Sequence, residues 1–301
     1  TESMVLLENV DGFLPISKQT NVIMLTGPNA DAVDVLLGNY SGYSGSLVTF
    51  LEGIVGAASV GSRVIHAQGC ALVGPAPDGD PYNMVRWEGR RSDVLIACMG
   101  LSPKMEGEEG DESLGLGDGD RNNTELPPSQ VHFLKYLDSM DKPIVLVLTG
   151  GSPITLPEGL KNVKAVIMAW YPGCEGGNAL ADLIFGECAF SGRLPVTFPD
   201  PGQDLPPIGD YSMENRTYKF MRHEPRYAFG YGLSTTSYEY SELEVIESPN
   251  GEFTVQAMVQ NTGNRPGKEI VQVYVRDLEA STRVPRHKLA AFRSIHLDQG
   301  E

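Results

Sequence analysis

The feature that most constrains the fold is a series of short apolar runs separated by segments whose apolar residues have helical spacing. Strands buried on both faces of a parallel sheet are near-continuous apolar runs, because neither face meets water. The runs occupy residues 21–26, 63–67, 94–99, 144–149 and 165–170, and the helical segments occupy 47–58, 84–91, 129–140 and 178–185. Strand and helix therefore alternate, which predicts an α/β fold with a mostly parallel sheet covered by helices on both faces.

Three local expectations accompany this pattern. Residues 3–8 have the composition of the last turns of a helix, and residues 216–220 have that of a short edge strand. Gly186 is expected to end the helix that begins near residue 178. In the segment 47–58 the predicted buried face carries Leu47, Leu51, Ile54 and Val55.

The second half of the chain changes character and predicts further domains. Residues 1–199 form the α/β part, and 200–235 are rich in proline and glycine, as in a linker or covering segment. From 236 to 301 the apolar period becomes two, which predicts a β-sandwich. Such a sandwich needs about seven strands, more than this stretch holds. We therefore expect it to be incomplete here or completed by another chain, and an unfinished sheet edge favours association, for example as a homo-oligomer.

Charge and composition exclude several classes of partner. The formal net charge is −16, from 39 acidic and 23 basic residues, which argues against nucleic acid and against anionic membrane surfaces. No apolar run is long enough to span a bilayer. The first residues lack a signal-peptide pattern, so periplasmic, secreted and cytoplasmic locations all stay open. The four cysteines lack metal-ligand spacing, and buried free thiols are expected.

A long acidic segment follows the apolar run 94–99. Residues 100–127 are rich in glycine and glutamate and hold few apolar residues. Loops of this length are usually functional or disordered. Ligands of open α/β sheets bind beyond the carboxyl ends of the strands. The segment is therefore a candidate site, and the alternative is a solvated acidic loop.

Two other turns allow more than one interpretation. The turn 27–30 (Gly-Pro-Asn-Ala) follows the first strand, where a phosphate could bind, but no GK[ST] or GxGxxG motif follows. A plain strand-to-helix turn is therefore favoured over a nucleotide-binding domain. The loop 38–45 carries Tyr40 and Tyr43, which could stack on a ring-shaped ligand or pack locally.

Several segments together resemble glycoside hydrolase family 3. The matching segments are 2–9, 12–15, 27–30, 38–42, 171–177, 191–195, 216–218 and 229–234, followed by 261–263, 267–275 and 285–301. The last three resemble the fibronectin-III-like module of that family. The resemblance implies a six-stranded α/β sandwich domain followed by a partial fibronectin-III-like β-sandwich.

The resemblance also implies an activity. Family members of this kind are retaining hydrolases that release β-linked glucose or xylose from the non-reducing end of oligosaccharides, and no cofactor is implied. Their nucleophilic Asp lies on a (β/α) barrel domain, which is absent from this chain. The α/β domain supplies the general acid/base Glu from a loop. The alternative of a different class is a non-catalytic carbohydrate-binding or structural module.

Matching the strand and loop pattern identifies Glu106 as the first candidate for the acid/base. Glu108 is the second candidate and Glu109 the third, since each follows the same strand within a few residues. Asp120 and Arg121 are expected to hold the loop in place by a salt bridge. The histidines show no metal-binding or triad pattern, and no cysteine has the context of a nucleophile.

Overall fold

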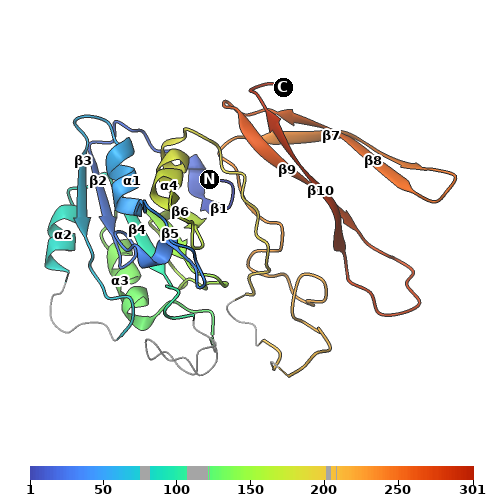
Figure 1. The fold of residues 1–301 in the computed structure, drawn as a ribbon, viewed down its shortest axis with the longest axis horizontal. Helices are drawn as coiled ribbons and strands as arrows, with labels where there is room; N and C mark the ends of the chain where they lie inside the picture. Colours follow the sequence, from blue (N-terminus) through green and yellow to red (C-terminus); the bar gives the residue numbers. More distant parts are fainter. Residues whose placement is uncertain (75–81, 107–120, 122, 201–204, 208) are drawn as a thin grey trace.

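A six-stranded sheet forms the centre of the α/β part (Figure 1). The computed structural model of the chain describes residues 1–74, 82–106, 121, 123–200, 205–207 and 209–301. The strand order is β1-β6-β5-β4-β2-β3, with β1 antiparallel to β6 and the other pairs parallel. The strands are β1 (Val5–Asn9), β2 (Val22–Thr26), β3 (Arg63–Ala67), β4 (Val94–Gly100), β5 (Ile144–Thr149) and β6 (Val163–Met168). The predicted α/β sandwich is confirmed.

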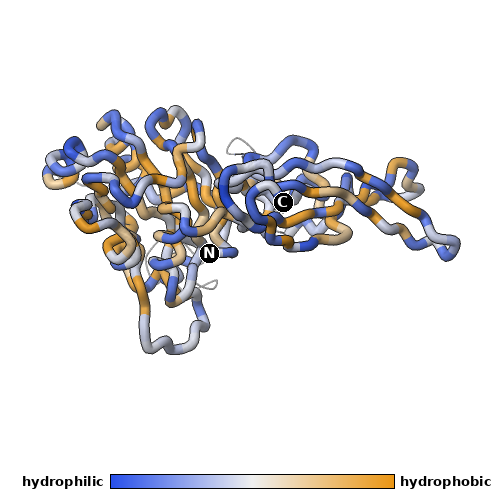
Figure 2. The backbone as a smooth tube through the Cα atoms, turned by 90° about the horizontal axis from the view of Figure 1, so that it is seen from above, coloured by the Kyte–Doolittle hydropathy of each residue, from blue (hydrophilic) through white to orange (hydrophobic). Residues whose placement is uncertain are grey.

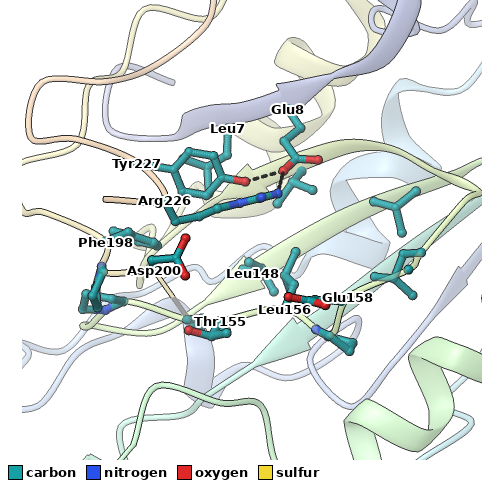
Figure 3. A pocket seen from close by; sticks show the side chains of 18 residues that line it. Leu7, Glu8, Leu148, Thr155, Leu156, Glu158, Phe198, Asp200, Arg226 and Tyr227 are labelled. Carbon is teal, nitrogen blue, oxygen red and sulfur yellow. Dashed lines mark hydrogen bonds and ion pairs between the residues drawn. The ribbon is translucent and has the colours of Figure 1, made fainter. Parts of the chain in front are cut away.

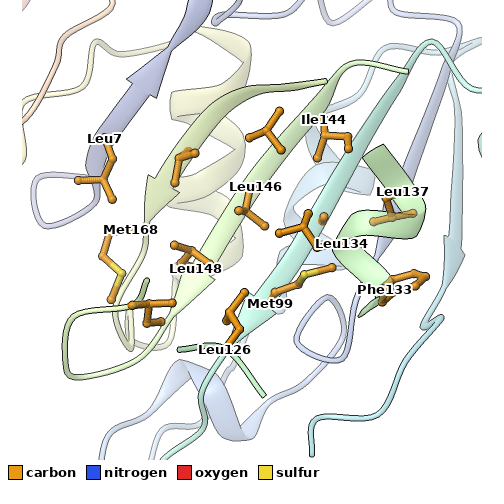
Figure 4. Packing of buried hydrophobic residues seen from close by; sticks show 14 of the residues in the cluster. Leu7, Met99, Leu126, Phe133, Leu134, Leu137, Ile144, Leu146, Leu148 and Met168 are labelled. Atoms are coloured by element: carbon orange, nitrogen blue, oxygen red, sulfur yellow. The ribbon is translucent and has the colours of Figure 1, made fainter. Parts of the chain in front are cut away.

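Helices cover both faces of this sheet. They are α1 (Phe50–Ala57), α2 (Asn83–Gly89), α3 (Pro128–Asp138) and α4 (Gly176–Phe185), with short 3-10 helices at Val10–Gly12 and Asp34–Leu36. Alternate side chains of each central strand enter opposite cores, because neighbouring side chains in a strand point to opposite faces. From β4, Leu95 and Met99 pack on the α3 side (Figure 4), whereas Ile96 and Cys98 pack on the α1 and α4 side. Figure 2 shows the hydrophobic residues gathered along the central strands.

Helices α1 and α4 approach each other through two glycines. A Cβ added to Gly53 would lie 2.1 Å from backbone atoms of Gly177. Helix α1 starts with a capping box, in which Thr49 and Glu52 exchange hydrogen bonds. Because the contact turns Gly53 toward α4, Val55 is left exposed. The expected buried face of this helix was therefore partly wrong, although Ile54 is buried as predicted.

Two other local predictions were wrong. Residues 3–8 do not end a helix: strand β1 pairs with β6, and Val5, Leu6 and Leu7 are all buried. A short apolar run buried on both faces has no period that separates strand from helix. Residues 216–220 form turns rather than an edge strand, because Arg216 bonds the carbonyls of Pro207 and Asp210. By contrast, α4 ends as predicted at Gly186, which is left-handed.

Two antiparallel pairs of strands follow the α/β part. They are β7 (Tyr238–Glu247) with β8 (Phe253–Asn261), and β9 (Gly267–Val275) with β10 (Lys288–Leu297). They correspond to the predicted partial fibronectin-III-like β-sandwich. Apolar side chains of these strands remain exposed in this chain, among them Leu243, Val245 and Phe253.

A buried ion pair joins the strands β7–β10 to the α/β part. Arg193 Nη2 lies 2.8 Å from Glu269 Oε2, and the two side chains are only 13% and 10% exposed. The hydroxyl of Tyr240 donates to the other oxygen of Glu269 at 2.8 Å. On the same side, Gln272 donates to the carbonyl of Gly230. The β-strands are thus attached to the sheet domain by specific polar contacts.

Candidate active site at the carboxyl edge of the sheet

Two buried amide side chains fix the edge of the sheet where the acidic segment begins. Gln130 of α3 accepts from the N–H of Gly100 and donates to its carbonyl, both at 2.8 Å. Asn29 donates to Thr149 Oγ1 at 2.8 Å and to the carbonyl of Leu101 at 3.3 Å. Both amides are almost fully buried. The turn 27–30 therefore holds the ends of β4 and β5 together.

Glu106 lies at this edge with its carboxylate bound by three donors. The N–H of Gly151 donates to Oε2 at 2.8 Å, and Ser152 Oγ donates to Oε1 at 2.6 Å. The hydroxyl of Tyr171 also donates to Oε2. These donors follow β5 and β6, so Glu106 connects the loops after three neighbouring strands. Both carboxylate oxygens of Glu106 accept hydrogen bonds, and Oε2 accepts two.

Arg121 secures the far end of the acidic segment. Its guanidinium donates to Ser152 Oγ at 2.9 Å and to the carbonyls of Pro153 and Glu125, both at 3.0 Å. Burial lowers the pKa of Arg121, and the negative charge of Glu106 opposes that shift. Arg121 thus holds the loop through hydrogen bonds to these partners, and the expected salt bridge stays a prediction. Asp120, its expected companion, lies outside the described residues.

Tyr171 is kept protonated at this site. Burial and the hydrogen bond to Glu106 raise the pKa of Tyr171 far above its usual range. A phenol held in the neutral form donates a hydrogen bond to the carboxylate throughout the physiological pH range. Tyr171, Ser152 and Gly151 thus form a fixed receptor for the Glu106 side chain.

The loop 38–45 lies against the backbone of Glu106. Asn39 Nδ2 donates to the carbonyl of Glu106 at 3.0 Å. Tyr40 is 90% exposed with a left-handed backbone (φ 60°), and Tyr43 is fully exposed. Local packing, one of the two interpretations of this loop, is therefore wrong for the ring of Tyr43. The ring of Tyr43 stands in solvent.

The sequence identified part of this constellation. Glu106 was identified, whereas its donors Gly151, Ser152 and Tyr171 were missed. They are 45, 46 and 65 residues away along the chain. The signal that could have found them is positional, since the loops after neighbouring parallel strands meet at one edge. Glu108 and Glu109 lie outside the described residues.

A separate cavity of about 310 Å³ lies beside β1 and the loop 153–160 (Figure 3). Apolar side chains that line it include Leu7, Leu148 and Phe198. At its rim the Glu8 carboxylate is bound by Arg226 at 2.7 Å and by the hydroxyl of Tyr227. Glu8 is thus committed to an ion pair. Glu106 does not line this cavity.

Metal and thiol chemistry find no support among the described residues. No group of three His, Cys, Asp or Glu side chains in that part of the chain could hold a metal ion. All four cysteines are free; Cys70 and Cys98 are buried as expected, whereas Cys174 and Cys188 are only half-buried. Burial raises the pKa of the Cys70 thiol to about 12, which makes it a poor nucleophile. No helix in the described ranges is long and apolar enough to cross a membrane.

The fold and the edge site define an α/β domain with an anchored acidic loop, joined to fibronectin-like strands. Residues 4–235 match the family profile of the glycosyl hydrolase family 3 C-terminal domain, and residues 269–301 match that of a fibronectin type III-like domain. The chain therefore belongs to glycoside hydrolase family 3.

Proteins similar to this chain include both xylosidases and glucosidases. A xylan 1,4-beta-xylosidase of Xylanibacter ruminicola is 39% identical over 209 residues, which are 69% of this chain and 24% of that protein. A periplasmic beta-glucosidase of Salmonella typhimurium is 31% identical over all of this chain and 42% of its own length. The crystal structure of a beta-glucosidase from Bifidobacterium adolescentis superposes with a TM-score of 0.85 at 28% identity, covering 99% of this chain and 44% of the other. The chain thus spans less than half the length of these relatives.

Proposed function

We propose that this chain supplies the general acid/base Glu of a retaining β-glucosidase or β-xylosidase. The substrates would be oligosaccharides with β-linked glucose or xylose at the non-reducing end. The nucleophilic Asp would lie on a (β/α) barrel domain outside this chain. The observation that carries the proposal is the acidic segment itself, which leaves the carboxyl end of β4 and is tied to the loops after β5 and β6 through Glu106.

Retaining hydrolysis uses two carboxyl groups about 5–5.5 Å apart. The carboxylate nucleophile bonds to the anomeric carbon while the bond to the leaving oxygen breaks, and the acid/base carboxyl gives its proton to that oxygen. Water then attacks the glycosyl ester and gives a proton back to the same carboxylate, and the nucleophile leaves as a free carboxylate. The acid/base must therefore reach the leaving oxygen with an unencumbered carboxyl.

The hydrogen bonds of Glu106 bear on which glutamate has this role. Each oxygen of Glu106 already accepts from a donor within its own domain. Such a side chain fits the role of holding the base of the acidic segment. Of the three candidates, Glu106, Glu108 and Glu109, we propose that Glu108 donates the proton while Glu106 positions the segment.

The test uses Glu106→Gln and Glu108→Gln in the complete enzyme. An acid/base variant loses about 10²–10⁴-fold on disaccharides. It keeps activity on dinitrophenyl glycosides, whose leaving group needs no proton, and azide restores turnover of its glycosyl ester. We expect this pattern for Glu108→Gln. Glu106→Gln should lose activity on both substrates without rescue by azide.

Glu125→Gln serves as the matched control, because Glu125 lies near the end of the same segment and is exposed. The reverse pattern, with rescue of Glu106→Gln alone, would return the acid/base role to Glu106. Normal turnover of cellobiose and xylobiose by both variants would exclude the two candidates together.

The exposed tyrosines fit the same proposal as a stacking surface for a sugar ring. Aromatic rings bind the apolar faces of sugars. Tyr43 is fully exposed, and Asn39 ties its loop to the backbone of Glu106. We expect Tyr43→Ala in the complete enzyme to raise KM about 3–10-fold, which corresponds to roughly 0.7–1.4 kcal/mol. Tyr43→Phe keeps the ring and should behave as the wild type. Equal KM values for all three proteins would contradict the stacking role.

A further inference from the structure

The described residues of the segment after the α/β part form no helix or strand, yet hydrogen bonds and ion pairs hold them in place. We define the covering segment as residues 205–207 and 209–226. Arg216 donates to the carbonyls of Pro207 at 2.5 Å and Asp210 at 2.7 Å. Arg222 Nε lies 2.7 Å from Glu214. Internal hydrogen bonds of this kind fix a loop conformation without regular structure.

The loop between β9 and β10 braces the covering segment from outside. The guanidinium of Arg283 pairs with Glu214, donates to the carbonyl of Ser212 at 3.1 Å and lies 4.8 Å from the ring centre of Phe220. Further along, Arg286 donates to the carbonyl of Met221 at 2.6 Å. The fibronectin-III-like part therefore holds the covering segment in one conformation.

This braced segment presents apolar side chains to solvent. Tyr211 is 88%, Leu205 53% and Met213 40% exposed. Met213 also has a left-handed backbone (φ 62°), which is uncommon for a residue with a long side chain. Strained backbone persists where the surroundings fix it, often at functional surfaces. An ordered loop with exposed apolar groups has little conformational entropy left to lose on binding.

The position of the segment limits what it can bind. Asp200, which precedes it, and Arg226, its last residue, both line the cavity beside β1. Figure 1 shows it, in gold, toward the end of the molecule where the parallel strands have their carboxyl ends. The nucleophile of a retaining enzyme must come within about 5–5.5 Å of the acid/base carboxyl, so the domain that carries it has to approach this same end.

We propose that the covering segment is the docking surface for the nucleophile-bearing domain of the complete enzyme, with the β9–β10 loop as its brace. This inference rests on the proposed function. In this proposal the fibronectin-III-like part contributes to the active site indirectly. By holding the covering segment in place, that part sets the position of the nucleophile relative to the acid/base.

Oxidation of methionine in the complete enzyme tests the docking. Met213 and Met84 are both exposed in this chain, at 40% and 62%. With hydrogen peroxide as the probe and peptide mass spectrometry as the readout, we expect Met213 to be oxidised at least fivefold more slowly than Met84. Equal rates would overturn the proposal. Protection of Met213 that disappears when the enzyme is diluted to monomers would also overturn it, because a second copy would then be the occupant.

Arg283→Ala tests the brace in the same enzyme, with Glu2→Ala as control, since Glu2 forms an exposed ion pair elsewhere. Arg283→Ala should speed Met213 oxidation and lower kcat/KM at least fivefold, and the control should change neither. No difference between the two variants would overturn the bracing role. If the wild-type enzyme cleaves no glycoside while Met213 stays protected, the proposed function fails and the docking stands.

Discussion

The three groups that bind the carboxylate of Glu106 are all neutral hydrogen-bond donors. Ser152 and the Gly151 N–H serve as donors whose strength hardly depends on pH. Tyr171 adds a donor that burial keeps protonated, as the raised pKa of its phenol indicates. The hydrogen bonds to Glu106 are therefore kept at neutral pH, and the phenol proton of Tyr171 is lost only in strong alkali.

Tyr171→Phe should lower the free energy of unfolding of this chain by about 1–3 kcal/mol at pH 7, because a donor to a carboxylate is lost. A raised folded-state pKa gives stability that is complete below the unfolded value, near 10, and is lost as pH rises above it. The difference between wild type and variant should therefore shrink above about pH 10. Urea unfolding between pH 7 and pH 11 measures it.

The exposed Tyr43 provides the control, since Tyr43→Phe should unfold as the wild type does at every pH. A constant gap between Tyr171→Phe and wild type across this range would show that the phenol proton of Tyr171 is not what supports the site.

At the scale of helices and strands, the sequence predicted an element correctly wherever the residues of that element alone set its apolar pattern or its end. Strand β4 and helix α4 with its final Gly186 were predicted because their residues alone specify them. Strand β1 was not, because its assignment depends on pairing with β6, far away in the chain. The same holds for the site. Glu106 follows β4 and could be found, whereas its donors are brought to it only by the order of the strands.

The close approach of α1 and α4 gives a prediction at this scale. Gly53→Ala should destabilise the chain by about 3 kcal/mol or more, because the new methyl group would overlap backbone atoms of Gly177. Gly56 lies on the same helix with nothing within 4 Å of an added Cβ. Gly56→Ala should therefore be neutral or stabilise by up to about 1 kcal/mol, through helix propensity.

Urea unfolding of the two glycine variants measures the difference directly. Both substitutions add the same methyl group to the same helix, so propensity cancels between them. Similar free energies of unfolding would mean that α1 and α4 can separate without cost, and would contradict the tight contact.

At the scale of the whole molecule, we expect one buried ion pair to couple the unfolding of the α/β part to that of the strands β7–β10. Arg193 follows the α/β sheet, and Glu269 belongs to β9. Removing one partner of a buried pair leaves the other charge without compensation, which costs more than the pair contributes. The hydroxyl of Tyr240 would lose its acceptor as well. Unfolding of the strands β7–β10 should therefore be coupled to that of the sheet domain through Glu269.

Glu269→Ala should lower stability by about 3 kcal/mol and uncouple the two parts. Both tryptophans, Trp87 and Trp170, lie in the α/β part, so fluorescence reports that part alone. Proteolysis within β7–β10 during a urea titration reports the other. We expect the two transitions to coincide in the wild type and to separate in Glu269→Ala, with the strands lost first. Glu2→Ala, which removes an exposed pair worth at most about 0.5 kcal/mol, should keep them together. Coincident transitions in Glu269→Ala would mean that other contacts, such as that of Gln272 with Gly230, couple the parts.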